Sequence, residues 1–104
     1  MIHQLRVYEI FEHNKTAFHD RFRDHAMRIM RTYGFDFVGQ WETVADGRTE
    51  FVYLLAWPDQ ETMESAWSAF QADQEWKDIK TVTGAEHGPL VGEIREKILV
   101  PVGY

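Results

Sequence analysis

Residues Val38–Trp57, VGQWETVADGRTEFVYLLAW, decide the fold. Apolar and polar side chains alternate on both sides of Asp46 and Gly47, and this dipeptide is typical of two-residue β-hairpin turns. The pattern predicts two antiparallel strands, Phe35–Val44 and Thr49–Trp57, joined by that turn. Because the hairpin carries so many bulky aromatic side chains, both of its faces need a partner.

The segment before the hairpin predicts a strand and a helix. Ile2–Ile10 is rich in β-formers and reads as a strand. Asn14 suits the N-cap of a helix that ends at Tyr33, because Gly34 suits the left-handed position after a helix. The apolar stripe of this helix is Phe18, Phe22, Ala26, Ile29 and Tyr33.

The segment after the hairpin predicts a second helix and a last strand. Pro58 ends the hairpin, and Asp59 suits the N-cap of a helix whose apolar stripe is Met63, Ala66, Trp67 and Phe70. We expect Trp76–Gly88 to be irregular and Pro89–Val100 to form the last strand, closed by Pro101.

The order β-α-β-β-α-β predicts an α+β, ferredoxin-like fold. Its four-stranded antiparallel sheet has the strand order 4-1-3-2, with two helices on one face. A chain of 104 residues is the size of one compact domain, so we expect a single domain over residues 1–104.

Counting outward from a two-residue turn assigns the hairpin side chains to two faces. Trp41 then lies opposite Val52, and Gln40 lies opposite Tyr53. The same count places Phe37 opposite Ala56. We expect the uncharged set, which alternates large with small side chains, to pack beneath the helices: Trp41, Val52, Gly39, Leu54, Phe37 and Ala56, with Leu5, Val7, Ile94 and Ile98. The set expected to face away from the helices is Glu42, Phe51, Gln40, Tyr53, Val38, Leu55 and Trp57, with Gln4, Arg6, Tyr8, Ile10, Glu93, Arg95 and Lys97.

The expected helix-free face therefore carries Tyr8, Phe51, Tyr53, Leu55 and Trp57. Monomers usually expose apolar patches of at most a few hundred Å2. Pairing two such sheets about a two-fold axis covers the face and encloses a barrel-like interior. The sequence thus predicts a homodimer with a barrel-like interior.

Composition excludes several classes of function. The net charge is −6 and the pI is near 5.3, which argues against nucleic-acid binding. There is no cysteine, and no apolar run approaches the length of a membrane span, so we expect a reducing, cytoplasmic location without membrane insertion. No His-x-x-x-His pair, carboxylate triad, phosphate loop or dinucleotide fingerprint occurs, so we expect no metal and no cofactor.

Five stretches, in their order and spacing, resemble the NIPSNAP family of the dimeric α/β-barrel superfamily. They are QLRVYEI (4–10), FHDRFRDHAMRIMRTYG (18–34), VGQWET (38–43), EFVYLLAW (50–57) and SAWSAFQADQEW (65–76). The residues that match the family pattern are Leu5, Arg6 and Tyr8, then Val38, Gly39 and Trp41, then Glu75 and Trp76. The chain departs from the pattern at Tyr53, where many relatives carry His, and at Leu55, where many carry an aromatic residue.

The resemblance implies a ferredoxin-like dimer and no established reaction. Superfamily neighbours include cofactor-free monooxygenases of phenolic or quinone-like substrates, small isomerases and dehydratases, and haem-binding members. Such folds host many unrelated functions.

Arg6 and Tyr8 are the first candidates for catalysis. They lie two apart on a central strand, so both side chains point to the same side. Arg6 can clamp a carboxylate or enolate, and Tyr8 can donate a hydrogen bond or a proton. The structural alternative is that Arg6 pairs with Glu42 or Glu93 while Tyr8 fills space.

His25 is the third catalytic candidate, as an acid/base group or a haem ligand. The alternative is a core histidine with one satisfied hydrogen bond, since His25 falls in the apolar stripe of the first helix. The expected ligand-binding residues are Gln40, Glu42, Phe51, Tyr53 and Trp57.

The sequence leaves three functions open. We expect binding of a small apolar or aromatic molecule in the barrel interior, with cofactor-independent catalysis of a monooxygenase or isomerase type. The alternatives are a non-catalytic sensing dimer and a structural homodimer with a filled interior. Whether the protein is an enzyme stays undecided.

Overall fold

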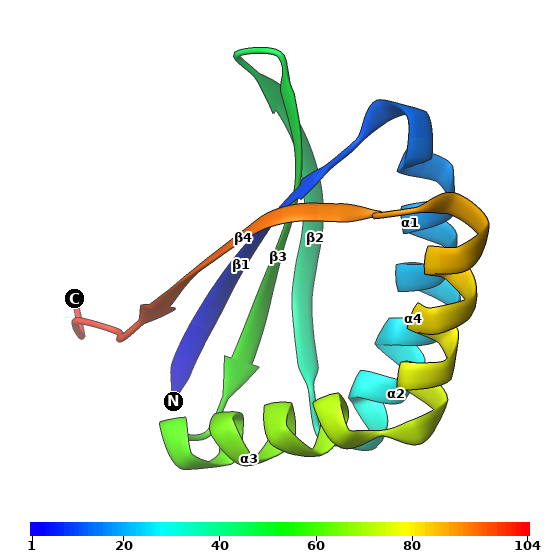
Figure 1. Cartoon of the computed structure of the whole chain (residues 1–104). Coiled ribbons are helices and arrows are strands. Elements are labelled where there is room, and N and C mark those ends of the chain that lie inside the picture. Colours follow the sequence, from blue (N-terminus) through cyan, green and yellow to red (C-terminus); the bar gives the residue numbers. More distant parts are fainter.

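The computed structural model describes all residues from Met1 to Tyr104. Figure 1 shows a curved sheet with the helices gathered on one of its sides and along one end. In chain order the elements are β1 (Ile2–Ile10), the 3-10 turn η1 (Glu12–Asn14), α1 (Lys15–Arg21), the π-helical turn η2 (Phe22–Ala26), α2 (Met27–Thr32), β2 (Asp36–Ala45), β3 (Arg48–Trp57), α3 (Gln60–Ala72), α4 (Gln74–His87) and β4 (Val91–Leu99).

The sheet has the strand order β2-β3-β1-β4 and is antiparallel throughout, which confirms the predicted 4-1-3-2 topology. The fold is therefore α+β and ferredoxin-like. Asp46 and Gly47 have φ values of 55° and 72°, as a two-residue hairpin turn of this type requires. This turn places Ala45 opposite Arg48, and the hairpin strands next to it pair in the predicted register.

The predicted register holds from the turn to Gly39. Trp41 lies opposite Val52, and Gly39 lies opposite Leu54. A β-bulge at Val38 then shifts the pairing, so that Phe37 lies opposite Leu55 and not opposite Ala56 as we expected. The extra residue turns the Phe37 side chain to the helical side, where its ring lies 6.1 Å from that of Phe22.

The predicted assignment of the two faces is wrong for β1, β3 and most of β2. The set expected to lie free of helices forms the core, because Phe51, Tyr53, Leu55 and Trp57 are all at most 5% exposed and pack on the helices. Conversely, Trp41 is 54% exposed on the helix-free side. We expected the uncharged set of side chains to be the buried one. This expectation failed because the polar members of the other set pair with one another in the interior.

The prediction for the edge strand β4 is right about the side of the sheet on which Ile94 and Ile98 lie. The two side chains are less buried than expected. Ile94 and Ile98 lie opposite Tyr8 and Gln4, so they share the helical side of the sheet. No helix covers this edge, however, and the two side chains are 50% and 36% exposed. The chain continues past β4 as a short tail that extends away from the sheet (Figure 1).

Residues Trp76–Gly88 are not irregular as we expected. Trp76–His87 belong to the helix α4, which begins after Asp73 and packs against α1, η2 and α3, and Gly88 follows as its C-cap. The Asp73 carboxylate accepts a hydrogen bond from the Trp76 backbone N–H at 2.8 Å, and the Trp76 ring stacks on Phe70 at 5.2 Å. Sequence inspection missed this helix because its β-branched residues and Gly84 have low helix propensity.

Two predicted helix features also differ in detail. The first helix begins where expected, but the Asn14 side chain does not cap it; its amide donates to the carbonyl oxygens of His87 and Pro89, tying α1 to the end of α4. Asp59 does cap α3, accepting from the Thr62 N–H at 2.7 Å. None of the helices combines the length and apolar character that crossing a bilayer requires.

Candidate functional site

Arg6 lies at the centre of a polar network on the helix-covered side of β1. Its Nη1 donates to Glu96 at 2.8 Å, its Nη2 to the Tyr8 hydroxyl at 3.2 Å and its Nε to the Tyr53 hydroxyl at 3.4 Å. The guanidinium also lies 4.3 Å from the ring centroid of Trp67. Although burial disfavours its charge, the oxygens of Tyr8 and Tyr53 hold the pKa of Arg6 above its ordinary value.

Tyr8 and Tyr53 form a hydroxyl pair beside Arg6. Their oxygens are 2.6 Å apart, and the rings of Phe18, Phe22 and Phe51 surround the two phenols. Tyr53 is fully buried, and this burial, together with Tyr8, raises the pKa of its phenol. The Tyr53 hydroxyl therefore stays protonated near neutral pH, and the two hydroxyls act as hydrogen-bonding groups.

Gln4 extends the network toward α3. Its Oε1 accepts from the indole N–H of Trp57 at 3.0 Å and of Trp67 at 2.9 Å, and its Nε2 donates to Glu96 at 2.8 Å. Partial burial opposes ionisation of Glu96, but the hydrogen bonds from Arg6 and Gln4 hold its pKa below the ordinary value. A polar opening of about 380 Å3 beside α3 reaches Arg6 and Glu96.

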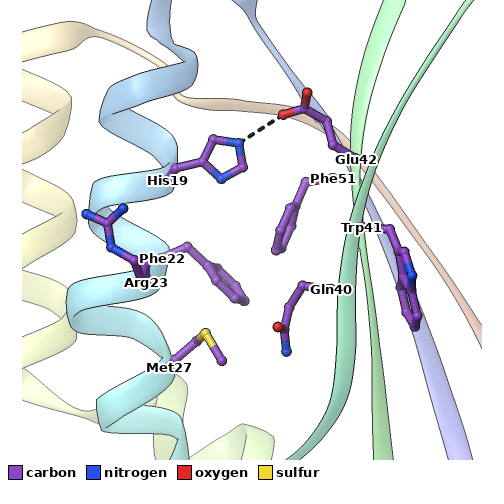
Figure 2. Close-up of a pocket in the computed structure, with 8 residues that line it drawn as sticks. All are labelled: His19, Phe22, Arg23, Met27, Gln40, Trp41, Glu42 and Phe51. Atoms are coloured by element: carbon purple, nitrogen blue, oxygen red, sulfur yellow. Dashed lines mark hydrogen bonds and ion pairs between the residues drawn. The ribbon is translucent and has the colours of Figure 1, made fainter.

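An open pocket of about 340 Å3 lies between the first helix and β2–β3 (Figure 2). Apolar side chains form its walls: Phe22 and Met27 from the helix and Phe51 from β3. The polar side chains that line it are His19, Arg23, Gln40 and Glu42. Trp41 touches the same region but points to the other side of the sheet in Figure 2, where its ring covers Gly39.

His19 and Glu42 join the two walls of the pocket. The His19 Nε2 lies 2.9 Å from Glu42 Oε1, and the Lys15 ammonium lies 3.3 Å from the other carboxylate oxygen. The hydrogen bond with His19, supported by Lys15, holds the pKa of Glu42 below its ordinary value. The carboxylate is therefore ionised and fixed near neutral pH.

The π-helical turn η2 shapes the helical wall. Its residues Phe22–Ala26 lie between α1 and α2, and Phe22 and Arg23 line the pocket together with Met27, the first residue of α2. A π turn inserts one extra residue into a helix, is costly, and is found often at functional sites. Here it rotates the later part of the helix and places Met27 on the pocket side.

The structure brings most of the predicted site residues together on one face. Arg6, Tyr8 and Tyr53 share the buried network, and Trp57 joins it through Gln4. The predicted ligand-binding residues Gln40, Glu42 and Phe51 line the pocket. Their face is the helix-covered one and not the free one.

His25 lies apart from the other predicted site residues. It is exposed on the outer side of the helix, beside α4, and its Nδ1 lies 3.4 Å from Arg28 Nη2. The expectation of a core histidine is therefore wrong, since the π turn shifts the helical phase at this point. The expected partner of Arg6 is also corrected, from Glu42 or Glu93 to Glu96.

Sequence reasoning missed His19, Gln4, Trp67 and Glu96. His19, Arg23 and Met27 are spaced by four residues, so a second stripe beside the apolar one was available as a signal. Glu96 follows from the predicted pairing of the first and last strands once their register is known. The described residues hold no group of three or more His, Asp or Glu side chains arranged for a metal ion.

The sheet order and the single helical layer define a class, the ferredoxin-like α+β proteins with the dimeric α/β-barrel fold. The NIPSNAP family model matches residues 3–104. The chain belongs to the NIPSNAP family.

Solved structures share this fold at low sequence identity. An uncharacterized NIPSNAP-like domain protein from Burkholderia xenovorans has a TM-score of 0.82 and 21% identity, over 99% of this chain and 86% of that chain. A NIPSNAP family protein from Agrobacterium tumefaciens has a TM-score of 0.83 and 14% identity, over 99% and 94%. A Streptomyces coelicolor monooxygenase in complex with the ligand nanaomycin D has a TM-score of 0.62 and 10% identity, over 99% and 88%. Among curated proteins, none matches this sequence.

Proposed function

We propose that the protein binds a small apolar or aromatic molecule in the pocket between the first helix and β2–β3. The observation that carries this proposal is the pocket itself: about 340 Å3, walled by Phe22, Met27 and Phe51, with polar groups at a few fixed places. Small-molecule sites typically have this size and this mixture of apolar wall and sparse polar groups. We further propose that any catalysis there uses the chain's own side chains and no cofactor.

Fold-level analogy supports the same proposal. The Streptomyces coelicolor monooxygenase with this fold was solved with nanaomycin D bound. Because its identity to this chain is 10%, the comparison supports a ligand-binding fold and carries no residue role.

Arg6, with Tyr8 bonded to it, is proposed as a second and separate polar centre, which the opening beside α3 reaches. Arg6 would hold an acidic or enolate group that enters by the opening beside α3, in place of Glu96. The alternative is a non-catalytic homodimer with a filled interior. That alternative is favoured by the pairing of Arg6, Tyr8, Tyr53 and Glu96 with one another, which leaves their interactions complete without a ligand.

We also propose that the protein is a homodimer formed through the helix-free face. The aromatic set that first motivated this prediction lies under the helices, so the support comes from other residues. Trp41 is 54% exposed, and the half-buried Leu5, Val7, Val52 and Leu54 surround the middle of the same face. Charges of both signs border it: Glu9, Glu50, Arg95 and Lys97. A second copy would cover this surface, as sheet-on-sheet packing requires. The cytoplasmic location stays a prediction.

The pocket proposal is tested by filling the pocket. Met27→Trp places a larger side chain in the cavity, whereas Ala85→Trp adds the same group to an exposed position of α4. Thermal shifts of the two variants and the wild type are compared across naphthols, naphthoquinones and aromatic acids. We expect at least one compound to stabilise the wild type and the Ala85 variant, and not the Met27 variant. Stabilisation that persists in Met27→Trp, or none in any protein, would contradict the proposal.

A further inference from the structure

His19 is held rigidly at the rim of the pocket. Its ring forms T-shaped pairs with Phe18 and Phe51, with ring centroids 5.4 Å and 5.8 Å apart, while Nε2 bonds to Glu42 at 2.9 Å. The side chain is 36% exposed, so water and a small ligand both reach it. Two aromatic neighbours and one hydrogen bond thus fix the orientation of an accessible imidazole.

The contact with Glu42 decides which ring nitrogen of neutral His19 is free. The Glu42 carboxylate is ionised and can only accept, so Nε2 carries the proton that it donates. In the neutral ring the lone pair is then on Nδ1, which has no hydrogen-bond partner in the chain. Figure 2 shows this second nitrogen turned away from Glu42, toward the part of the pocket where Phe22 and Met27 lie.

We propose that His19 is a general base of this pocket, oriented by Glu42, and that the ligand is a small apolar or aromatic molecule with an enolisable C–H. This inference rests on the proposed binding function. Nδ1 takes the proton as the C–H electron pair forms the enolate, and the same N–H returns the proton to another carbon of the conjugated system. The step is an isomerisation, in which no electron is gained or lost and no oxidant is needed.

Glu42 and Lys15 complete the arrangement. Proton uptake makes His19 an imidazolium, and the carboxylate 2.9 Å away stabilises that charge in a partly apolar surrounding. Lys15 contacts Glu42 at 3.3 Å and Glu12 at 3.4 Å, so it fixes the carboxylate without touching the ligand. Lys15 is therefore a positioning residue.

The test uses 5-nitrobenzisoxazole, an aromatic probe of proton abstraction. A base removes its ring C–H proton, the electron pair forms a nitrile, and the N–O bond breaks to release a coloured nitrophenolate. The Michaelis constant reports binding in the pocket, and kcat reports the base. The variants are His19→Gln and Glu42→Gln, with His13→Gln as the matched control, because His13 is exposed and lies outside the pocket.

We expect saturable catalysis by the wild type and by His13→Gln. General bases contribute about 100-fold or more, so kcat falls by about 100-fold in His19→Gln and by roughly tenfold in Glu42→Gln, with little change in the Michaelis constant. If turnover is saturable and His19→Gln leaves it unchanged, His19 is not the base. A wild type that is no faster than buffer would also overturn the base assignment. Non-saturating kinetics that Met27→Trp does not alter would instead show that the pocket proposal fails. Circular dichroism of each variant confirms that it is folded.

Discussion

Removing the Arg6 guanidinium tests whether the interior network stabilises the fold. Arg6→Met keeps an unbranched apolar stem and removes the ion pair with Glu96, two hydrogen bonds to tyrosine oxygens and the contact with Trp67. The Arg6 side chain is 14% exposed, but Glu96 is 45% exposed and keeps its hydration.

The expected loss follows from these exposures. Breaking a fully buried ion pair costs about 3–5 kcal/mol, and the exposure of Glu96 reduces that cost. The two hydrogen bonds are long, and the guanidinium–indole contact is worth about 1 kcal/mol. We expect a loss of about 2–3 kcal/mol, which in a domain of this size lowers the unfolding midpoint by roughly 10–20 °C.

The assay is thermal unfolding at one protein concentration, followed by circular dichroism. Arg28→Met is the matched control, because Arg28 pairs with Glu75 at 2.8 Å while both side chains are about half exposed. Such surface pairs contribute about 0–1 kcal/mol. If Arg6→Met lowers the midpoint no more than Arg28→Met does, the network does not stabilise the fold.

Three further predictions concern the dimer, the turn and the capping of α4. Trp41→Glu should convert a dimer into a folded monomer near 12.3 kDa in sedimentation equilibrium, and a wild type that is already monomeric would refute the proposed interface. Gly47→Val should destabilise the hairpin by at least about 1 kcal/mol in chemical unfolding, since Gly47 has a φ of +72°; an unchanged midpoint would contradict this. The hydrogen bonds from Tyr33 and the Trp76 N–H hold the pKa of Asp73 below its ordinary value, so its contribution is present above the unfolded-state pKa and is lost as the pH falls through the folded-state pKa. Asp73→Asn should therefore weaken the acid-induced loss of stability, and an identical stability-against-pH curve would refute that role.

The hairpin was predictable because local chemistry determines it. Asp46 and Gly47 need positive φ angles for a two-residue turn, and that turn fixes the pairing as far as Gly39. The bulge at Val38 was not predicted, although Gly39 follows it, because a single glycine inside a strand does not show which residue is left unpaired. The strand order followed from the element order alone, since short connections and right-handed crossovers leave few alternatives.

The pattern of polar and apolar residues could not show which face of the sheet is buried. Both faces carry aromatic residues, and the buried one also carries Gln4, Arg6 and Glu96. These polar groups are tolerated because each finds a partner across strands or on α3, which depends on tertiary contacts. The same dependence explains the site. Arg6 and Tyr8 were found from their spacing, whereas the four-residue spacing of His19, Arg23 and Met27 gained a functional meaning only with Glu42 beside His19.

The site assignment is tested most directly by the methyl groups of the methionines. Met27 lines the pocket, Met63 lines the opening that reaches Arg6, and Met30 lies in the core. Protein labelled with 13C in the methionine methyl groups is titrated with 2-naphthol and followed by NMR. The proposed function predicts a saturable shift of the Met27 signal, with Met30, Met63 and the exposed Met1 unchanged. A shift of Met63 with Met27 unmoved, or no shift of any methionine, would contradict it.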